Sequence, residues 1–267
     1  MNHDVIRRRP LQARRFAATR TAIGAVATAA GIVPAELLLR AVTLRNRPYL
    51  PIWFHRGLAR ALGLRIRTYG LPARRRGVLF VCNHVSWADV PVLGARINAS
   101  FIAKSEVENW GPLGWFASFA HTVYVARERR SSAAAQRNEI AERLNNGGSL
   151  ILFPEGTNSD GTGVLPFKSA LFSVVNEVPG LIIQPVTLAY TRINGLPVTR
   201  QHLPDLAWMG DTELGPHAFG LMGLGRVTAE ILFHDPVDPS DYPDRKALAR
   251  HCHGIIAAGY RRLMRGG

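Results

Sequence analysis

The chain has 267 residues, of which 47% are hydrophobic, so it can bury a sizeable core and does not have the composition of a disordered chain. It carries 33 Lys and Arg against 19 Asp and Glu, and this net charge of +14 favours an anionic partner. The basic groups are not interleaved with aromatic residues and no zinc-finger spacing occurs, so we expect an anionic membrane surface and no nucleic acid. Two cysteines, Cys82 and Cys252, exclude a disulfide framework.

The N-terminal region combines an Arg-rich start with an apolar segment at residues 21–39 that is interrupted by Pro34 and Glu36. Four interpretations are open: a membrane-embedded or re-entrant helix pair, an amphipathic interfacial anchor, a cleavable twin-arginine-type signal, or an ordinary packed helix. The apolar character continues beyond any small-residue cleavage site, so we favour a membrane-associated helical segment. Whether residues 21–44 span the bilayer or lie on it stays open, and the Arg-rich flank favours a cytoplasmic N-terminus.

The remainder alternates between helical periodicity and short apolar runs. Residues 51–63 and 245–264 have the spacing of amphipathic helices, and residues 131–146 begin with Ser and end before a Gly pair. Residues 65–70 alternate as a strand does, and residues 192–225, which are rich in Gly and Pro, predict a long loop or excursion. Runs typical of buried strands are residues 78–82, 100–103, 122–126, 149–153, 181–188 and 227–233.

Strands that alternate with helices predict an α/β fold with a mostly parallel central sheet flanked by helices. We expect two parts: residues 1–63, with the basic N-terminus and the membrane-associated helices, and residues 64–267, with the α/β domain. In a parallel sheet, binding and catalytic residues gather at the carboxyl ends of the strands.

The segment NHVSWAD, residues 83–89, directly follows a buried run and contains His84 and Asp89. On a straight helix these two side chains would point about 140° apart, so they can meet only if His84 lies in a strand-to-helix turn and Asp89 in the first helical turn. Ser86 with Asp89 three residues later has the capping-box spacing that would start that helix. An imidazole oriented by a carboxylate is suited to act as a general base.

Three further charged residues also follow predicted strands. Lys104 comes after the run at 100–103, Arg127 follows the run at 122–126, and Glu155 follows the run at 149–153 within FPEGTNS. Parallel strands would bring these residues to one edge of the sheet, where two cations beside a His/Asp pair indicate a site for an anionic group. A single cation at such a position is usually a solvated charge, and the loop of Glu155 alone could be a plain turn.

These residues form blocks that occur in a fixed order along residues 78–190. The blocks are His84 and Asp89 in a His-x4-Asp motif, Arg127 in TVYVARERR (122–130), Glu155 in FPEGTNS (153–159), and Pro185 in IQPV (183–186). In this order they resemble the glycerolipid acyltransferases of the bacterial 1-acylglycerol-3-phosphate acyltransferase type. The segments at residues 159–172 and 207–217 look like bacterial members, including those that acylate lyso-ornithine lipid.

The resemblance implies an O-acyltransferase that works without a metal or a bound cofactor. His84, oriented by Asp89, would take the proton from a lysolipid hydroxyl, which would then attack the acyl thioester of acyl carrier protein or coenzyme A. Lys104 and Arg127 would bind the anionic head of the acceptor, and the loop of Glu155, Gly156, Thr157 and Asn158 would shape its site. Such an enzyme would lie at the bacterial inner membrane, with its active site facing the cytoplasm.

Asn158 departs from the family pattern, because members that use a phosphate-bearing acceptor often have Arg at this position. A neutral amide cannot provide the charged, bidentate contact that Arg makes with phosphate. This argues against lysophosphatidate as the sole acceptor and favours lyso-ornithine lipid, so the expected product is ornithine lipid, phosphatidic acid or both.

Two other hypotheses remain at this point. Cys82, two residues from His84, could form an acyl-enzyme intermediate, although a Cys at the end of an apolar run is more often a small buried hydrophobic residue. The chain could also be a non-catalytic basic membrane-binding module that has kept the motif.

Overall fold

The computed structural model describes residues 50–104, 123–125, 130–209 and 212–266, together with eight helical positions between Thr19 and Pro34. The expectations for Arg127 and for most of residues 1–49 therefore fall outside the described residues. The elements are α2 (Leu50–Ala61), β1 (Leu64–Tyr69), β2 (Val78–Cys82), α3 (Asp89–Gly94), β3 (Ser100–Lys104), β4 (Val123–Val125), α5 (Arg130–Asn145), β5 (Leu150–Leu152), η3 (Ser169–Asn176), β6 (Ile182–Ile193), β7 (Leu196–Pro197), η4 (Arg200–His202), α6 (Leu203–Leu206), α7 (Leu214–Gly223), β8 (Val227–Phe233), η5 (Pro239–Asp241) and α8 (Arg245–Met264).

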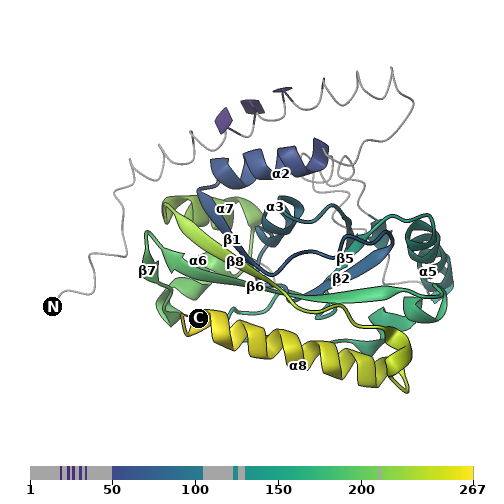
Figure 1. Cartoon of the computed structure of the whole chain (residues 1–267). Helices are drawn as coiled ribbons and strands as arrows, with labels where there is room; N and C mark the ends of the chain where they lie inside the picture. Colours follow the sequence, from purple (N-terminus) through teal and green to yellow (C-terminus); the bar gives the residue numbers. More distant parts are fainter. Residues whose placement is uncertain are drawn as a thin grey trace.

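A single sheet organises the molecule, with the strand order β1-β8-β6-β2-β5-β3-β4 and β7 paired to β6. All pairs are parallel except those that β6 makes with β7 and with β8. The α2 and α3 helices lie over one face of the sheet and α8 runs along the other (Figure 1). The expected α/β fold with a mostly parallel central sheet and flanking helices is confirmed.

The central strand β2 shows why its sequence is continuously apolar. Val78, Phe80 and Cys82 belong to one hydrophobic cluster, and Leu79 and Val81 belong to the other. Successive side chains of a strand point to opposite faces of the sheet, so a strand covered on both faces needs apolar residues at every position. The carboxyl end of β2, where His84 follows, is thus fixed by packing on both sides.

The helices also follow their sequence signals. Asp244 caps α8 by accepting hydrogen bonds from the backbone N–H groups of Lys246 and Ala247, and the arginines of α8 stay exposed while Leu248 and Ile256 are buried. Within α2, Phe54 and Ala59 are buried against the α/β unit, whereas Trp53 is 55% exposed. No helix in the described part of the chain is long and apolar enough to cross a membrane.

The prediction of a long loop at residues 192–225 is wrong. This stretch holds the end of β6 as well as β7, η4, α6 and the ten-residue helix α7. Its Gly and Pro content hid the helical period, because α7 contains three glycines and a proline in LGPHAFGLMG. Burial of His217 and Leu221 against the rest of the molecule outweighs the low intrinsic helix propensity of the glycines and the proline.

Candidate active site

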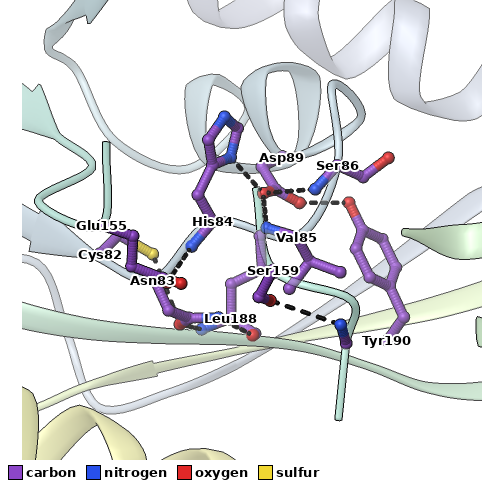
Figure 2. Close-up of polar contacts among 11 residues, drawn as sticks. Cys82, Asn83, His84, Val85, Ser86, Asp89, Glu155, Ser159, Leu188 and Tyr190 are labelled. Carbon is purple, nitrogen blue, oxygen red and sulfur yellow. Dashed lines mark hydrogen bonds and ion pairs between the residues drawn. The ribbon is translucent and has the colours of Figure 1, made fainter. Parts of the chain in front are cut away.

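His84 and Asp89 meet at the carboxyl end of β2, as Figure 2 shows. His84 lies in the turn after the strand, Asp89 is the first residue of α3, and His84 Nδ1 is 2.7 Å from Asp89 Oδ2. A carboxylate only accepts, so Nδ1 carries the hydrogen and the neutral ring keeps its free lone pair on Nε2. Asp89 is fully buried whereas the His84 side chain is 18% exposed, so the imidazole retains access to a substrate.

The Asp89 carboxylate is bound by four donors. Its Oδ2 accepts from His84 Nδ1, from the Val85 N–H at 2.7 Å and from the Ser86 N–H at 3.0 Å. Its Oδ1 accepts from the Tyr190 hydroxyl at 2.7 Å. A buried charge is tolerated only when it is paired and hydrogen-bonded, and this set of donors meets that condition.

The predicted capping box at Ser86 forms only in part, and the prediction that Ser86 caps α3 is wrong. The N-cap residue is Ala88, without a side-chain cap, and Ser86 Oγ is buried with no hydrogen-bond partner among the described residues. The reason is a turn that precedes the helix, in which the Asp89 N–H donates to the Ser86 carbonyl oxygen at 3.0 Å. The reciprocal half of the box, from the Ser86 N–H to Asp89, is present.

The loop after β5 fixes the backbone of His84. Glu155 Oε1 accepts from the His84 N–H at 2.8 Å, and the Ser159 N–H donates to the His84 carbonyl oxygen at 2.8 Å. The ring of Phe153 stacks on the imidazole, with centroids 4.0 Å apart and planes 14° from parallel. Both main-chain groups and one ring face of His84 are therefore held by residues 153–159.

Both carboxylate oxygens of Glu155 are used within the protein, because Oε2 accepts from the Leu165 N–H at 2.9 Å. Burial raises the pKa of Glu155 from 4.5 to about 7; the negative charge of Asp89 adds to the rise, and the two backbone donors oppose it. The carboxyl group thus links the His84 turn to the segment at Leu165.

The other residues of this loop differ in how they are engaged. Gly156 is buried and has φ +69°, a left-handed conformation that favours glycine, and Thr157 is exposed. Asn158 is half-buried, and its Nδ2 is buried with no hydrogen-bond partner in the part of the chain that the structure describes. A buried amide donor without a partner is costly, so Asn158 holds an unsatisfied donor beside the fully paired Glu155.

The two predicted cations cannot be placed as side chains. Lys104 is the last residue of β3, and its backbone pairs with Val125 of β4, so that both strands end at the same edge of the sheet. The side chain of Lys104 and all of Arg127 lie outside the described residues. Their binding of an acceptor stays a prediction.

The sequence patterns did not indicate several residues that support the motif. Asn83 bridges to β6 through two hydrogen bonds with the backbone of Leu188, at 2.9 and 2.8 Å.

Trp87 Nε1 donates to His217 Nδ1 at 3.0 Å, and His217 Nε2 lies 2.9 Å from the Ala207 carbonyl oxygen. Burial lowers the pKa of His217, which favours the neutral ring that can accept from Trp87. Tyr190 and His217 are far from the motif in the chain. For Tyr190 the available signal was a polar residue within an apolar strand, and His217 ends the segment 207–217 that resembles bacterial family members.

Cys82 is poorly suited to act as a nucleophile. It is fully buried, and its Sγ lies 3.9 Å from Asn83 Oδ1. Burial, together with the charges of Asp89 and Glu155, raises the pKa of the thiol well above its usual range. The reactive species of cysteine is the thiolate, which this environment disfavours.

A separate cavity of about 450 Å³ lies between the β1, β6 and β8 strands and the C-terminal end of α8, and its described lining includes none of the predicted site residues that the structure places. Among the described residues, no group of three or more His, Cys, Asp or Glu side chains is arranged to hold a metal ion. The His84–Asp89 turn, and not this cavity, combines an imidazole with a carboxylate that orients it.

Comparison with known proteins agrees with the four sequence blocks. The sequence model of the family described as "Acyltransferase" matches residues 65–189. The lyso-ornithine lipid O-acyltransferase of Brucella abortus is 43% identical over 239 residues, covering 87% of this chain and 90% of the relative. The lyso-ornithine lipid O-acyltransferase of Rhizobium meliloti is 38% identical, covering 82% and 77%.

Relatives with a different acceptor in their names are also similar. The 1-acyl-sn-glycerol-3-phosphate acyltransferase of Neisseria meningitidis is 32% identical, covering 76% of this chain and 77% of the relative. The crystal structure of the 1-acyl-sn-glycerophosphate acyltransferase of Thermotoga maritima matches with a TM-score of 0.62 at 21% identity, covering 92% of this chain and 97% of that one. At this identity the structural match supports the fold alone.

Proposed function

The chain belongs to the acyltransferase family, and from this premise we propose that it transfers a fatty acyl group from a thioester to the hydroxyl group of lyso-ornithine lipid. The observation that carries the proposal is the 2.7 Å hydrogen bond between His84 Nδ1 and Asp89 Oδ2, which leaves Nε2 as a base beside solvent. A non-catalytic membrane-binding module would have no need for a fixed imidazole tautomer.

The geometry supports a direct transfer. His84 Nε2 takes the proton of the acceptor hydroxyl while that oxygen attacks the carbonyl carbon of the thioester. The C–S bond breaks, the thiolate of the carrier leaves, and the proton passes from His84 to that sulfur. Asp89 stabilises the imidazolium that forms between these steps, as a buried carboxylate does for a catalytic histidine. Neither a metal nor a covalent acyl-enzyme is required.

The acceptor preference rests on Asn158 and on the relatives. The two relatives with 43% and 38% identity bear the name lyso-ornithine lipid O-acyltransferase. The unpartnered Nδ2 of Asn158 can donate one neutral hydrogen bond, which suits the carboxylate of an amino-acid head group better than the dianionic phosphate of lysophosphatidate. Lysophosphatidate is the second candidate, favoured by the similarity to the Neisseria meningitidis enzyme.

The proposal extends to the remaining substrate contacts and to the cellular site. Lys104 and Arg127 bind the anionic head of the acceptor, and Glu155 supports that site by holding its loop. The donor is acyl carrier protein or acyl coenzyme A, both of which are acidic and attracted by the net charge of +14.

We place the enzyme at the cytoplasmic face of the bacterial inner membrane. Ile23 and Val26 are 64% and 68% exposed at helical positions. In α2, Cζ of the Arg56 guanidinium lies over the ring of the exposed Trp53, 4.9 Å from the centroid of that ring. Exposed apolar side chains together with basic residues are typical of segments that bind an anionic bilayer surface.

The experiment that tests the function compares acceptors under identical conditions. Membranes that contain the full-length protein receive labelled acyl carrier protein and either lyso-ornithine lipid or lysophosphatidate, and His84→Ala membranes serve as the control. We expect label in ornithine lipid that depends on His84. Label in phosphatidate alone would contradict the acceptor assignment, and label in neither product with folded protein would contradict the function.

A further inference from the structure

Tyr190 contacts the buried side of the His84–Asp89 pair from a distant part of the chain. It lies on β6, 101 residues after Asp89, and its hydroxyl donates to Asp89 Oδ1 at 2.7 Å (Figure 2). Within the described residues, His84 and Tyr190 are the two side chains that donate to this carboxylate, since the other two donors are backbone N–H groups. Tyr190 is 3% exposed and Asp89 fully buried, so water does not replace this contact.

The direction of the hydrogen bond is fixed by the chemistry of the two groups. An ionised carboxylate only accepts, so the phenol must donate. Burial, and next the negative charge of Asp89, raise the pKa of Tyr190 well above its usual range, so the hydroxyl keeps its proton at neutral pH. Tyr190 therefore acts as a permanent neutral donor to Asp89.

The two oxygens of Asp89 are unequally supplied. Oδ2 accepts from three donors that all come from the His84–Ser86 turn, whereas Oδ1 accepts from Tyr190. Loss of the hydroxyl would leave Oδ1 buried without a partner and would release the carboxylate from β6. The negative charge, no longer shared with a donor on Oδ1, would then act more strongly on a proton held by His84.

We propose that Tyr190 is a positioning residue for acyl transfer, which orients Asp89 and limits how strongly Asp89 holds a proton on His84. This inference rests on the proposed function of the His84–Asp89 pair. A general base must release its proton to the leaving sulfur as well as accept it, so a carboxylate that binds the imidazolium too tightly slows the second step. The donor on Oδ1 counteracts that effect.

Other titratable groups near Asp89 do not replace Tyr190. Burial keeps Cys82 of β2 an uncharged thiol, and both oxygens of Glu155 in the loop after β5 accept from the N–H groups of His84 and Leu165. Tyr260 of α8 donates its own hydroxyl to the Gly161 carbonyl oxygen at 2.6 Å. Tyr260 is 4% exposed, as deeply buried as Tyr190, but it has no hydrogen bond to Asp89. It therefore provides a matched control.

The first test compares Tyr190→Phe with Tyr260→Phe in the full-length protein, with acyl carrier protein as donor. For Tyr190→Phe we expect kcat to fall about tenfold, the KM for the acceptor to stay within about twofold, and the acid limb of the kcat/KM profile to move up by about half a pH unit or more. The acid limb of Tyr260→Phe should stay in place. An unmoved acid limb in Tyr190→Phe, or an equal shift in both variants, would overturn the inference.

Two further measurements separate positioning from packing. In an Asp89→Asn background, Tyr190→Phe should lower kcat by less than about twofold, because its effect passes through the carboxylate. If Tyr190→Phe does not fold, 3-fluorotyrosine at position 190 keeps the ring and makes the hydroxyl a stronger donor, and the acid limb should then move to lower pH. A shift to higher pH would contradict the inference. Wild-type protein without His84-dependent turnover would refute the proposed function, whereas normal wild-type turnover with an unmoved variant profile would refute this inference alone.

Discussion

The two loops that meet at His84 differ in how completely their polar atoms are paired. In the turn after β2, the carboxylate of Asp89 accepts four hydrogen bonds and the backbone of His84 is bound on both sides. In the loop after β5, Glu155 is equally well paired, but three residues later the buried Nδ2 of Asn158 has no partner among the described residues. Polar groups that make all their hydrogen bonds fix the geometry of a base, whereas a donor without a partner is free to bind a substrate.

Asp89→Asn tests the fully hydrogen-bonded turn after β2, because it keeps the shape of the side chain and removes its negative charge. The amide oxygen can take the place of Oδ2 and accept from its three donors, while the amide NH2 group donates to the Tyr190 oxygen, so the fold should survive. Without the negative charge, the imidazolium loses its stabilisation, and we expect kcat to fall by about 100-fold or more. Steady-state acylation of lyso-ornithine lipid measures this change.

Asp160→Asn is the control for that variant. Asp160 is exposed, and its carboxylate accepts from the N–H and hydroxyl groups of Thr162 rather than from the motif. Its kcat should remain within about twofold of the wild-type value. Similar losses in both variants would mean that any change of charge near the site disturbs activity, and that pairing at Asp89 has no special role.

Glu155→Gln tests the second carboxyl group whose oxygens both accept hydrogen bonds, and its effect is measured as a change in the free energy of unfolding. The amide NH2 group must face one of the two backbone N–H donors, which should cost about 1–3 kcal/mol of unfolding free energy. In the wild type, the carboxyl group of Glu155 has a pKa of about 7 in the folded state and 4.5 in the unfolded state. The folded state therefore binds more protons than the unfolded state between these pH values. The contribution of Glu155 to stability is therefore present below pH 4.5 and is lost as the pH rises to about 7.

Denaturant unfolding at several pH values measures that contribution, since Gln does not titrate. The stability advantage of the wild type over Glu155→Gln should shrink by up to about 3 kcal/mol between pH 4.5 and pH 7. The titratable groups that both proteins share cancel in the difference. A constant difference across this range would show that Glu155 stays ionised in the folded protein.

Asn158→Arg tests the loop after β5, where the Nδ2 group of Asn158 has no partner among the described residues. A guanidinium supplies the charged, bidentate contact that phosphate requires, so the ratio of lysophosphatidate to lyso-ornithine lipid turnover should rise about tenfold. Asn158→Asp, which is nearly isosteric and negatively charged, should lower that ratio instead. Competition between the two acceptors in one reaction measures the ratio directly, and equal ratios in all three proteins would remove Asn158 from the acceptor site.

Cys82→Ala should have the smallest effect. The thiol is buried in the core of β2, and its removal should cost about 1–2 kcal/mol of stability through lost packing, with kcat within about twofold of the wild type. Protein incubated with labelled thioester in the absence of acceptor should carry no acyl group. Acylated wild-type protein that becomes unlabelled in Cys82→Ala would support the acyl-enzyme hypothesis.

Local sequence patterns predicted the framework of the site and missed its long-range support. The buried run at residues 78–82 coincides with β2, and the His84–Asp89 contact follows from the turn that the motif required. Tyr190 could not be predicted as a partner of Asp89, because the pairing of β6 with β2 depends on contacts about 100 residues apart. The helix α7 was missed because tertiary packing of His217, and not local propensity, stabilises it.

The most direct measurement is the rate of acyl transfer to lyso-ornithine lipid by full-length wild-type, His84→Ala and Cys82→Ala proteins in the same membranes, at matched amounts of folded protein. We predict that His84→Ala loses about 1,000-fold in kcat while Cys82→Ala retains wild-type turnover, because proton removal by the Asp89-oriented imidazole drives the reaction. Undiminished transfer by His84→Ala, or its loss in a folded Cys82→Ala protein, would contradict a mechanism with His84 as the general base.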